Sequence, residues 1–151
     1  MKVTVRRGGS ADAGVAADLW LRARAAARAT IPPPRHTNED VRRWFASHVV
    51  QELELWLAES VDREVVGMLV LDGPWVDQLY LDPDWIGRGI GTRLIEFAKN
   101  QRPAGLRLWT FASNRRAQRF YERNGFLEVQ RTDGRHNEER APDIEFAWPG
   151  P

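Results

Sequence analysis

Apolar and polar positions along the chain follow two periods, and these predict an alternation of strands and helices. A period of two, as at Val3 and Val5, is typical of a half-buried strand. A helical period places Leu94 and Ala98 on the same side of a helix. The expected strands are Lys2 to Arg7, Leu53 to Ala58, Glu64 to Leu71, Val76 to Leu81, Leu106 to Thr110, Phe126 to Thr132 and Ile144 to Trp148.

The first predicted helix follows a pair of glycines and ends before a run of prolines. Ser10 can cap it, because a serine oxygen accepts hydrogen bonds from the unpaired amides of a first turn. The helix should run to about Ala29, since Pro32 and the two prolines after it cannot continue a helix. Its apolar side carries Leu19, Trp20, Ala23 and Ala27, and we expect Arg22, Arg24 and Arg28 to lie largely on the polar side.

Three further helices carry recognisable signals at their ends. Thr37 and Asp40 resemble a capping box at the start of the second helix. The third helix begins within a group of glycines near Ile90. The fourth starts at Asn114 and ends at Asn124-Gly125, a pair typical of a helix C-terminus.

The connections between these elements predict how the strands pair. The three strands between residues 53 and 81 are joined by turns, so they should form an antiparallel meander. The strand at 106–110 follows a strand–helix crossover, and it should therefore run parallel to the strand at 76–81. The last two strands pair across a polar connection at 133–142. No repeat or linker divides the sequence, and we expect one domain over residues 1–151.

One stretch of the sequence has the features of an anion-binding site. Residues 75–101 combine an apolar strand, a turn, three closely spaced glycines and a helix. The first amides of a helix have no partner within it and lie at the positive end of its dipole, so they favour a phosphate. Gly87, Gly89 and Gly91 would let the main chain take positive φ and approach a bulky anion. The alternative is a glycine-rich turn that binds nothing.

Two other phosphate-binding loops are excluded. A dinucleotide fingerprint needs a third glycine one position later and an acid about 20 residues on, where this chain has Thr110 and Phe111. A P-loop needs Gly-Lys followed by Ser or Thr, which does not occur. Arg88 and Thr92 add a positive charge and a hydroxyl donor beside the glycines.

Composition and charge exclude several classes of function. With 42% hydrophobic and 28% charged residues, the sequence is that of an ordinary globular protein. A formal charge of +1 gives no general electrostatic reason to bind nucleic acid or an anionic membrane. A nucleic-acid module using the arginines of the fourth helix is a weaker alternative, since their spacing is that of a solvated helix face. These arginines are Arg115, Arg116, Arg119 and Arg123.

The absence of cysteine removes disulfides, thiolate metal sites and a cysteine nucleophile together, and it suits a reducing compartment. The N-terminal residues contain no apolar stretch of signal-peptide length, and no apolar run approaches the roughly 20 residues of a membrane span. We therefore expect a cytoplasmic protein that binds neither nucleic acid nor membrane. The three histidines are scattered without ligand spacing, so we expect no metal site.

Two blocks of sequence resemble the GCN5-related N-acetyltransferases, the GNAT superfamily. Leu81-Asp82-Pro83 followed by Gly87-Arg88-Gly89-Ile90-Gly91 is similar to the acetyl-CoA loop of that family. Asn114-x-x-Ala117-x-x-x-Tyr121-x-x-x-Gly125-Phe126 is similar to its second block. The expected order of elements also matches along nearly the whole chain. The resemblance implies an α/β (α+β) fold, a single GNAT-like domain with a mixed, mostly antiparallel central sheet whose splayed parallel central strands are flanked by helices.

The resemblance implies acetyl-CoA as co-substrate, with its pantetheine arm in the gap between the splayed strands, hydrogen-bonded as a further strand would be. The backbone of Leu79, Tyr80 and Leu81 would bind the arm, while the side chains of Leu79 and Leu81 are simply explained by core packing. The pyrophosphate would lie at Ile86, Gly87, Arg88, Gly89, Ile90, Gly91 and Thr92. Relatives often have Gln or Arg at the position of Ile86, so one phosphate contact is missing here.

The resemblance also implies direct transfer, for which no cysteine intermediate is available. The backbone N–H of Leu81 would stabilise the oxyanion. Tyr121 matches the family position that protonates the departing sulfur. From the residues alone, the favoured interpretation is that Tyr121 simply packs with Phe120 at helical spacing. Asn114 would cap its helix and contact the cofactor.

The general base is the less determined catalytic group. Alternation places Asp77 on the same side of the central strand as Leu79 and Leu81, which makes it the best-placed carboxylate. The alternative is a solvated aspartate near the start of a strand. Some relatives carry a glutamate on the strand before Asn114, but this chain reads Leu-Arg-Leu-Trp-Thr there. An ordered water is therefore the second candidate for accepting the proton.

The acceptor is described only as a class. The resemblance implies N-acetylation of a primary amine on a small molecule, a peptide or a protein N-terminus, and it also suggests a homodimer. The alternative is a non-catalytic CoA-binding or regulatory module on the same fold. His36 lies in the region that shapes the acceptor pocket in this family, although a loop histidine often faces solvent. Glu39, Asp40 and Glu138 would favour a cationic amine.

Overall fold

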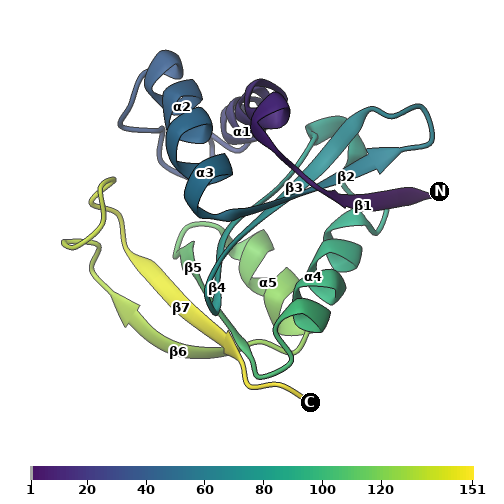
Figure 1. Cartoon of the computed structure of the whole chain (residues 1–151). Helices are drawn as coiled ribbons and strands as arrows, with labels where there is room; N and C mark the ends of the chain where they lie inside the picture. Colours follow the sequence, from purple (N-terminus) through teal and green to yellow (C-terminus); the bar gives the residue numbers. More distant parts are fainter. Residues whose placement is uncertain (1) are drawn as a thin grey trace.

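The structure is a computed structural model that describes residues 2–151. One seven-stranded sheet runs through the molecule, with the strand order β1-β2-β3-β4-β5-β7-β6 (Figure 1). Its strands are β1 (Val3–Arg7), β2 (Glu54–Ser60), β3 (Val65–Asp72), β4 (Trp75–Leu81), β5 (Leu106–Phe111), β6 (Leu127–Thr132) and β7 (Asp143–Trp148). The predicted fold class is confirmed, because β4 and β5 are parallel and the other neighbouring strands are antiparallel.

Helices cover both faces of the sheet. They are α1 (Ala13–Ala26), α2 (Asn38–Trp44), α3 (Val50–Glu52), α4 (Ile90–Gln101) and α5 (Arg115–Arg123), with a wider turn at Phe45–Val49 between α2 and α3. Short 3-10 turns precede α1 (Ser10–Asp12) and α4 (Pro83–Trp85). In Figure 1, α1 to α3 lie on one side of β2, β3 and β4, while α4 and α5 lie on the other.

Strand β3 separates two hydrophobic cores. Met68 and Val70 pack with α1, α2 and the turn that follows α2. Leu69 and Leu71 point to the other side and pack with α4 and α5. All four side chains have at most 1% of their surface exposed, so β3 is buried on both faces. The single strand thereby fixes the helices of the two sides relative to each other.

The helix starts show one correct prediction and one wrong one. At α2, Thr37 Oγ1 accepts from Asp40 N–H at 3.0 Å and Asp40 Oδ2 accepts from Thr37 N–H at 3.3 Å, which confirms the capping box. Before α1, the capping carboxylate belongs to Asp12, which accepts from Gly9 N–H at 2.8 Å. The prediction that Ser10 caps this helix is wrong, because Ser10 lies inside the 3-10 turn.

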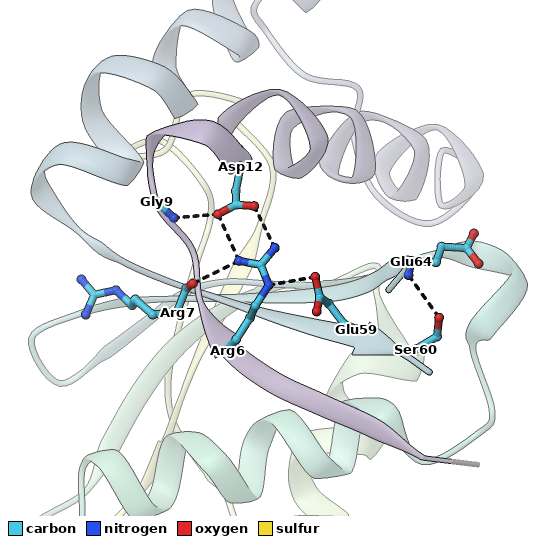
Figure 2. A network of polar contacts seen from close by, with 7 residues as sticks. All are labelled: Arg6, Arg7, Gly9, Asp12, Glu59, Ser60 and Glu64. Carbon is cyan, nitrogen blue, oxygen red and sulfur yellow. Dashed lines mark hydrogen bonds and ion pairs between the residues drawn. The ribbon is translucent and has the colours of Figure 1, made fainter. Parts of the chain in front are cut away.

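An arginine fastens edge strand β1 to the rest of the domain (Figure 2). Arg6 donates from Nε to Glu59 of β2 at 2.8 Å and from its terminal nitrogens to both oxygens of Asp12, at 2.8 and 3.2 Å. These bonds from Arg6 lower the pKa of Asp12. Strand β1 lies at one edge of the sheet, and the charge of Arg6 is paired there with carboxylates of the same domain.

Candidate active site

The parallel strands β4 and β5 are paired only at their beginnings. Trp75 of β4 lies opposite Arg107 of β5, and Arg107 N–H donates to Pro74 C=O at 2.9 Å. On its other side β4 is paired with β3 as far as Leu81. Within residues 2–151, no strand pairs with the β5-facing side of β4 beyond Trp75. The main chain of Leu79, Tyr80 and Leu81 therefore lies along a gap, where an extended ligand could complete the strand.

The loop after β4 presents left-handed glycines to open space. Gly87 and Gly89 have φ of 85° and 83°, and a Cβ added to either would meet no atom within 4 Å. The first helical bond of α4 runs from Arg93 N–H to Gly89 C=O at 3.1 Å. The amides before Arg93 are therefore left without a helical acceptor, as an anion site requires.

Gly91 has a different role from the other two glycines. The prediction that it needs positive φ is wrong, because Gly91 lies inside α4 and has ordinary helical geometry. A Cβ at Gly91 would lie 3.2 Å from the ring of Phe120. The glycine is needed there so that α4 can approach α5 closely. Two glycines thus shape the loop, and the third sets the distance between two helices.

The other predicted loop residues surround this site. Ile86 is exposed over 41% of its surface, whereas Ile90 is buried in the core beneath the loop. Arg88 lies over the ring of Trp85 at 4.6 Å and donates to Asp84 C=O at 3.2 Å. Thr92 is exposed in the first turn of α4. The loop therefore has a cation and a hydroxyl on its outer surface, as predicted from the sequence.

Asp82 holds the turn that leads into the glycine loop. Its carboxylate accepts from Asp84 N–H at 2.9 Å and from Arg22 of α1 at 3.1 Å. Asp82 N–H also donates to Val66 C=O at 2.9 Å. The carboxyl group is nearly buried, with 11% of its side chain exposed. The start of the loop is thereby fixed to both α1 and β3, and no sequence pattern indicated the contact with Arg22.

Tyr121 lies on α5 with 8% of its surface exposed, and it contacts the rings of Phe126 and Phe146 with centroids 5.5 and 6.4 Å away. Burial raises the pKa of the Tyr121 phenol well above its ordinary value, and the phenol of Tyr80 adds to this effect. Its hydroxyl makes no hydrogen bond to any group of residues 2–151. Tyr121 is therefore a protonated donor whose proton is not engaged by the protein.

Asp77 lies at an irregularity of β4. Leu71 is opposite Val76 and Val70 is opposite Gln78, so Asp77 is the extra residue of a bulge. The bulge breaks the alternation that placed Asp77 on the side of Leu79, and that expectation is therefore wrong. The carboxylate accepts from Gln78 Nε2 at 3.2 Å.

The environment of Asp77 favours its protonated form. Although the side chain reaches solvent, desolvation by the surrounding protein raises the pKa of Asp77, and Asp72 adds to the effect. The bond from Gln78 and the nearby His48 oppose this shift. A carboxyl whose pKa is moved upward toward neutrality is better suited to accept a proton than one fixed in an ion pair.

A cavity of about 550 Å³ lies beside β5. It is lined by Trp109, Thr110 and Phe111 of β5, by Gln130, Thr132 and Asp143 of the last two strands, and by His136, Asn137 and Glu139 of the loop between them. The polar connection that separates β6 from β7 thus forms one wall. Thr110 Oγ1 is buried without a partner among the described residues. Two carboxylates line the cavity: Glu139 lies 3.8 Å from Arg24, and Asp143 accepts hydrogen bonds from the uncharged groups of Thr132 and Asn137.

Arg24 of α1 lies near two residues that line this cavity, Phe111 and Glu139. Only 7% of Arg24 is exposed, and its guanidinium lies 4.8 Å from the ring of Trp20 and 5.9 Å from that of Phe111. It donates to Pro32 C=O at 3.0 Å and lies 3.8 Å from Glu139 Oε2. The prediction that Arg24 lies on the polar side of the first helix is wrong. The signal that could have found it is Trp20 one helical turn earlier, a spacing that suits a cation–π contact.

Three further predicted site residues have defined partners. His36 Nε2 lies 3.0 Å from Glu138 Oε2, so the loop between α1 and α2 meets the loop between β6 and β7. Both side chains are more than half exposed. Asn114 Oδ1 accepts from Ala117 N–H at 3.2 Å, which confirms that it caps α5. Tyr80 contacts Trp20 edge to face at 6.1 Å, and burial raises the pKa of its phenol.

No group of three or more histidine, cysteine, aspartate or glutamate side chains within residues 2–151 is arranged to hold a metal ion. In the same part of the chain, none of the helices has the length and apolar character of a membrane span. The four arginines of α5 named above are exposed.

Comparison with known proteins gives the family. The model of the acetyltransferase (GNAT) domain matches residues 51–128, which is more than half of the chain. The peptidyl-lysine N-acetyltransferase YjaB of Salmonella typhimurium is 36% identical over 89 residues, which cover 59% of this chain and 61% of that protein. YjaB of Escherichia coli is 29% identical over 134 residues, 88% of each chain.

The fold is shared over its whole length with a solved relative. The solution structure of apo-form YjaB from Escherichia coli matches with a TM-score of 0.80 and 25% identity, and the match covers 100% of both chains. The matched family segment, 51–128, contains β4, the glycine loop, α4 and Tyr121. The chain belongs to the GNAT family of acetyltransferases, as its two sequence blocks predicted.

Proposed function

We propose that this protein is an acetyl-CoA-dependent N-acetyltransferase that transfers the acetyl group directly to a primary amine. The observation that supports this most strongly is the combination of three features within residues 75–121. In the described chain, the side of β4 that faces β5 has no partner strand beyond Trp75, the glycine loop follows directly, and the buried phenol of Tyr121 has no hydrogen-bond partner. Each of the three features can take part in acetyl transfer, and the packing of the domain does not by itself explain why all three are present.

The residues fit acetyl-CoA in size and chemistry. A diphosphate needs unpaired amides and room, and Gly87 and Gly89 have no neighbour within 4 Å of the position of a Cβ. An amide-containing arm needs unpaired strand groups, which Leu79, Tyr80 and Leu81 supply on the side of the gap. We assign Ile86, Arg88, Ile90, Gly91, Thr92 and Asn114 to the surroundings of the cofactor.

Acetyl-CoA, when bound, supplies the acetyl group as a thioester whose C–S bond breaks as the new C–N bond forms. In our proposal Asp77, directly or through an ordered water, takes the proton that the attacking amine loses. The Leu81 N–H donates to the oxygen that becomes negatively charged. Tyr121, whose phenol is protonated at neutral pH, donates its proton to the sulfur.

For the acceptor we propose a lysine side chain of a polypeptide. The two YjaB relatives carry the name peptidyl-lysine N-acetyltransferase, and Glu139 and Asp143 suit an ammonium group at the cavity. His36 would act at the entrance through its contact with Glu138. The absence of cysteine supports a cytoplasmic location for the reaction.

The proposal is tested by an acetylation screen with acetyl-CoA and a panel of lysine peptides, amino acids and small amines. We expect release of free thiol together with a mass increase of one acetyl group on lysine peptides. Binding of acetyl-CoA without thiol release over the whole panel would instead identify a non-catalytic CoA-binding module.

A further inference from the structure

On the face of the sheet that α1 to α3 cover at β2, β3 and β4, the outer strands β6 and β7 have no helix over them. Helices α1 to α3 lie over the side of the sheet formed by β2, β3 and β4, and β6 and β7 extend away from them (Figure 1). Large apolar side chains are exposed on these outer strands and on neighbouring β5. Trp109 of β5 is 42% exposed, and Leu127 and Val129 of β6 are 67% and 52% exposed. A group of exposed apolar side chains on neighbouring strands is a common sign of a binding surface.

Strand register places Trp109 and Leu127 on the same face. Trp109 is opposite Glu145 of β7, and two residues earlier Arg107 is opposite Ala147, which is itself opposite Leu127 of β6. Residues opposite each other in antiparallel strands share a face, as do residues two apart on one strand. The intervening Leu108 is 1% exposed and points into the core on the other side.

This face is held in place by a network of stacked and ion-paired side chains. The rings of Trp75 and Trp109 are parallel to within 4° at 6.5 Å, and the guanidinium of Arg107 lies 4.6 Å over Trp75. Arg107 Nε donates to Glu145 Oε2 at 2.7 Å, and Gln130 Nε2 donates to Glu145 Oε1 at 2.8 Å. The Glu145 carboxylate is only 1% exposed, and both of its oxygens are engaged. Its charge is balanced by Arg107.

We call the surface formed by Trp75, Arg107, Trp109 and Leu127 the aromatic platform. It is continuous with the acceptor cavity, because Trp109 lines that cavity together with Gln130. Among the described residues no cation pairs with the Asp143 carboxylate of the cavity, which accepts from Thr132 and Asn137, whereas the platform has a paired charge and exposed apolar surface. An occupant that satisfies both must present a cation and, beside it, a large apolar group.

We propose that the aromatic platform docks the residue next to the acceptor lysine and favours a large apolar side chain there. The inference rests on the proposed function, since it takes a polypeptide lysine as the acceptor. A lysine followed by leucine has the required cation and apolar group on adjacent residues. A small amine would fill the cavity alone and would leave Trp109 uncovered. A second copy of the chain would cover the platform without placing an ammonium group beside Glu139.

The test compares two fluorescently labelled peptides that differ only in the residue after a single lysine, which is leucine in one and serine in the other. We expect the leucine peptide to bind about tenfold more tightly by fluorescence anisotropy. Trp109→Ala should abolish this preference, and Leu127→Ser should reduce it. Val61→Ala provides a matched control, because Val61 is 76% exposed at the distant turn between β2 and β3. Thermal melts establish that the variants are folded.

The outcomes separate this inference from the proposed function, because anisotropy requires no turnover. Equal affinity for the two peptides, or a preference that survives both Trp109→Ala and Leu127→Ser, would overturn docking at the platform. Loss of self-association in Trp109→Ala, seen by sedimentation, would identify a second copy as the occupant and would also overturn it. A leucine preference without acetylation of either peptide would support docking while contradicting the proposed transferase activity.

Discussion

The two sides of the gap between β4 and β5 are built in different ways. The cofactor side is one continuous segment, residues 79–92, and it offers main-chain groups shaped by Gly87 and Gly89. The acceptor side is assembled from α1, β5 and the loop between β6 and β7, and it offers side chains. Main-chain groups suit a ligand that never changes, whereas side chains can be replaced to suit a different acceptor. The comparison predicts that substitutions on the two sides separate cofactor binding from acceptor recognition.

The largest expected effect is on kcat and comes from Tyr121, which we place where the cofactor side and the acceptor side meet. Tyr121→Phe removes one hydroxyl that has no hydrogen-bond partner in the described chain, so stability and acetyl-CoA affinity should be retained. We expect kcat to fall about 100-fold, since proton donation to the leaving sulfur is lost. Steady-state kinetics measures this, with thermal melts as the control for folding. Unchanged turnover would remove Tyr121 from the mechanism.

A second substitution should break only the cofactor side. Gly89→Val introduces a β-branched residue at φ 83°, in the loop that we assign to the diphosphate. We expect acetyl-CoA affinity, measured by calorimetry, to fall about 30-fold or more. Gly73→Val is the matched control, because Gly73 also has positive φ and no neighbour within 4 Å, but it lies in the turn before β4. Equal loss of affinity in both variants would assign the effect to general strain.

Asp77→Asn tests whether the Asp77 carboxylate of β4 accepts the proton of the attacking amine. We expect kcat/KM to fall about tenfold at neutral pH, at the low end for a general base because an ordered water can also relay the proton. The pKa of Asp77 is raised in the folded protein, so the folded state binds the proton more tightly than the unfolded state does. The free energy of unfolding therefore decreases as pH rises from the unfolded pKa of about 3.9 to the higher folded pKa.

The upward shift of the Asp77 pKa also predicts how the stability of Asp77→Asn compares with that of the parent protein. Asp77→Asn should be more stable than the parent protein at pH 7, and the difference should disappear below about pH 4. Denaturant unfolding at several pH values measures it. A variant that is less stable than the parent at pH 7 would show that the Asp77 carboxylate is stabilised in the folded protein, against the direction of its pKa shift.

The smallest effect distinguishes two ion pairs on the same loop. Glu139→Gln leaves the buried guanidinium of Arg24 without its carboxylate, which should lower the free energy of unfolding by about 1 kcal/mol. The loss should be smaller than for a tightly paired buried ion, because the two charged groups are 3.8 Å apart. Glu138→Gln is the neighbouring control, since its pair with His36 is more than half exposed and should contribute under about 0.5 kcal/mol. Equal losses would contradict a buried role for Arg24.

The same contrast explains what could be predicted from the sequence. The positive φ of Gly87 and Gly89, the capping roles of Thr37 and Asn114 and the antiparallel meander of β2, β3 and β4 are encoded within short segments, and these predictions are confirmed. Gly91 was misjudged because its constraint comes from Phe120 of another helix. Local sequence shows that a glycine is present, but it does not show which neighbour excludes a side chain.

The contacts of the acceptor side could not be predicted from the sequence, because they join segments that are far apart along the chain. Arg24 follows Trp20 by one helical turn, but its burial also depends on Phe111 and Glu139, which lie far away in the sequence. His36 and Glu138 are 102 residues apart. The bulge at Asp77 depends on the pairing of β4 with β3, which no local pattern indicates. The roles of Tyr121, Asp77 and His36 in the reaction stay predictions.

The central claim is that acetyl-CoA occupies the gap between β4 and β5 with its diphosphate at the glycine loop. A titration of the isotope-labelled protein with acetyl-CoA, followed by backbone amide resonances, tests it most directly. The account predicts the largest shifts at residues 79–81 and 87–92, retained in Gly73→Val and lost in Gly89→Val. Shifts confined to other parts of the chain, with these amides unmoved at saturating acetyl-CoA, would contradict it.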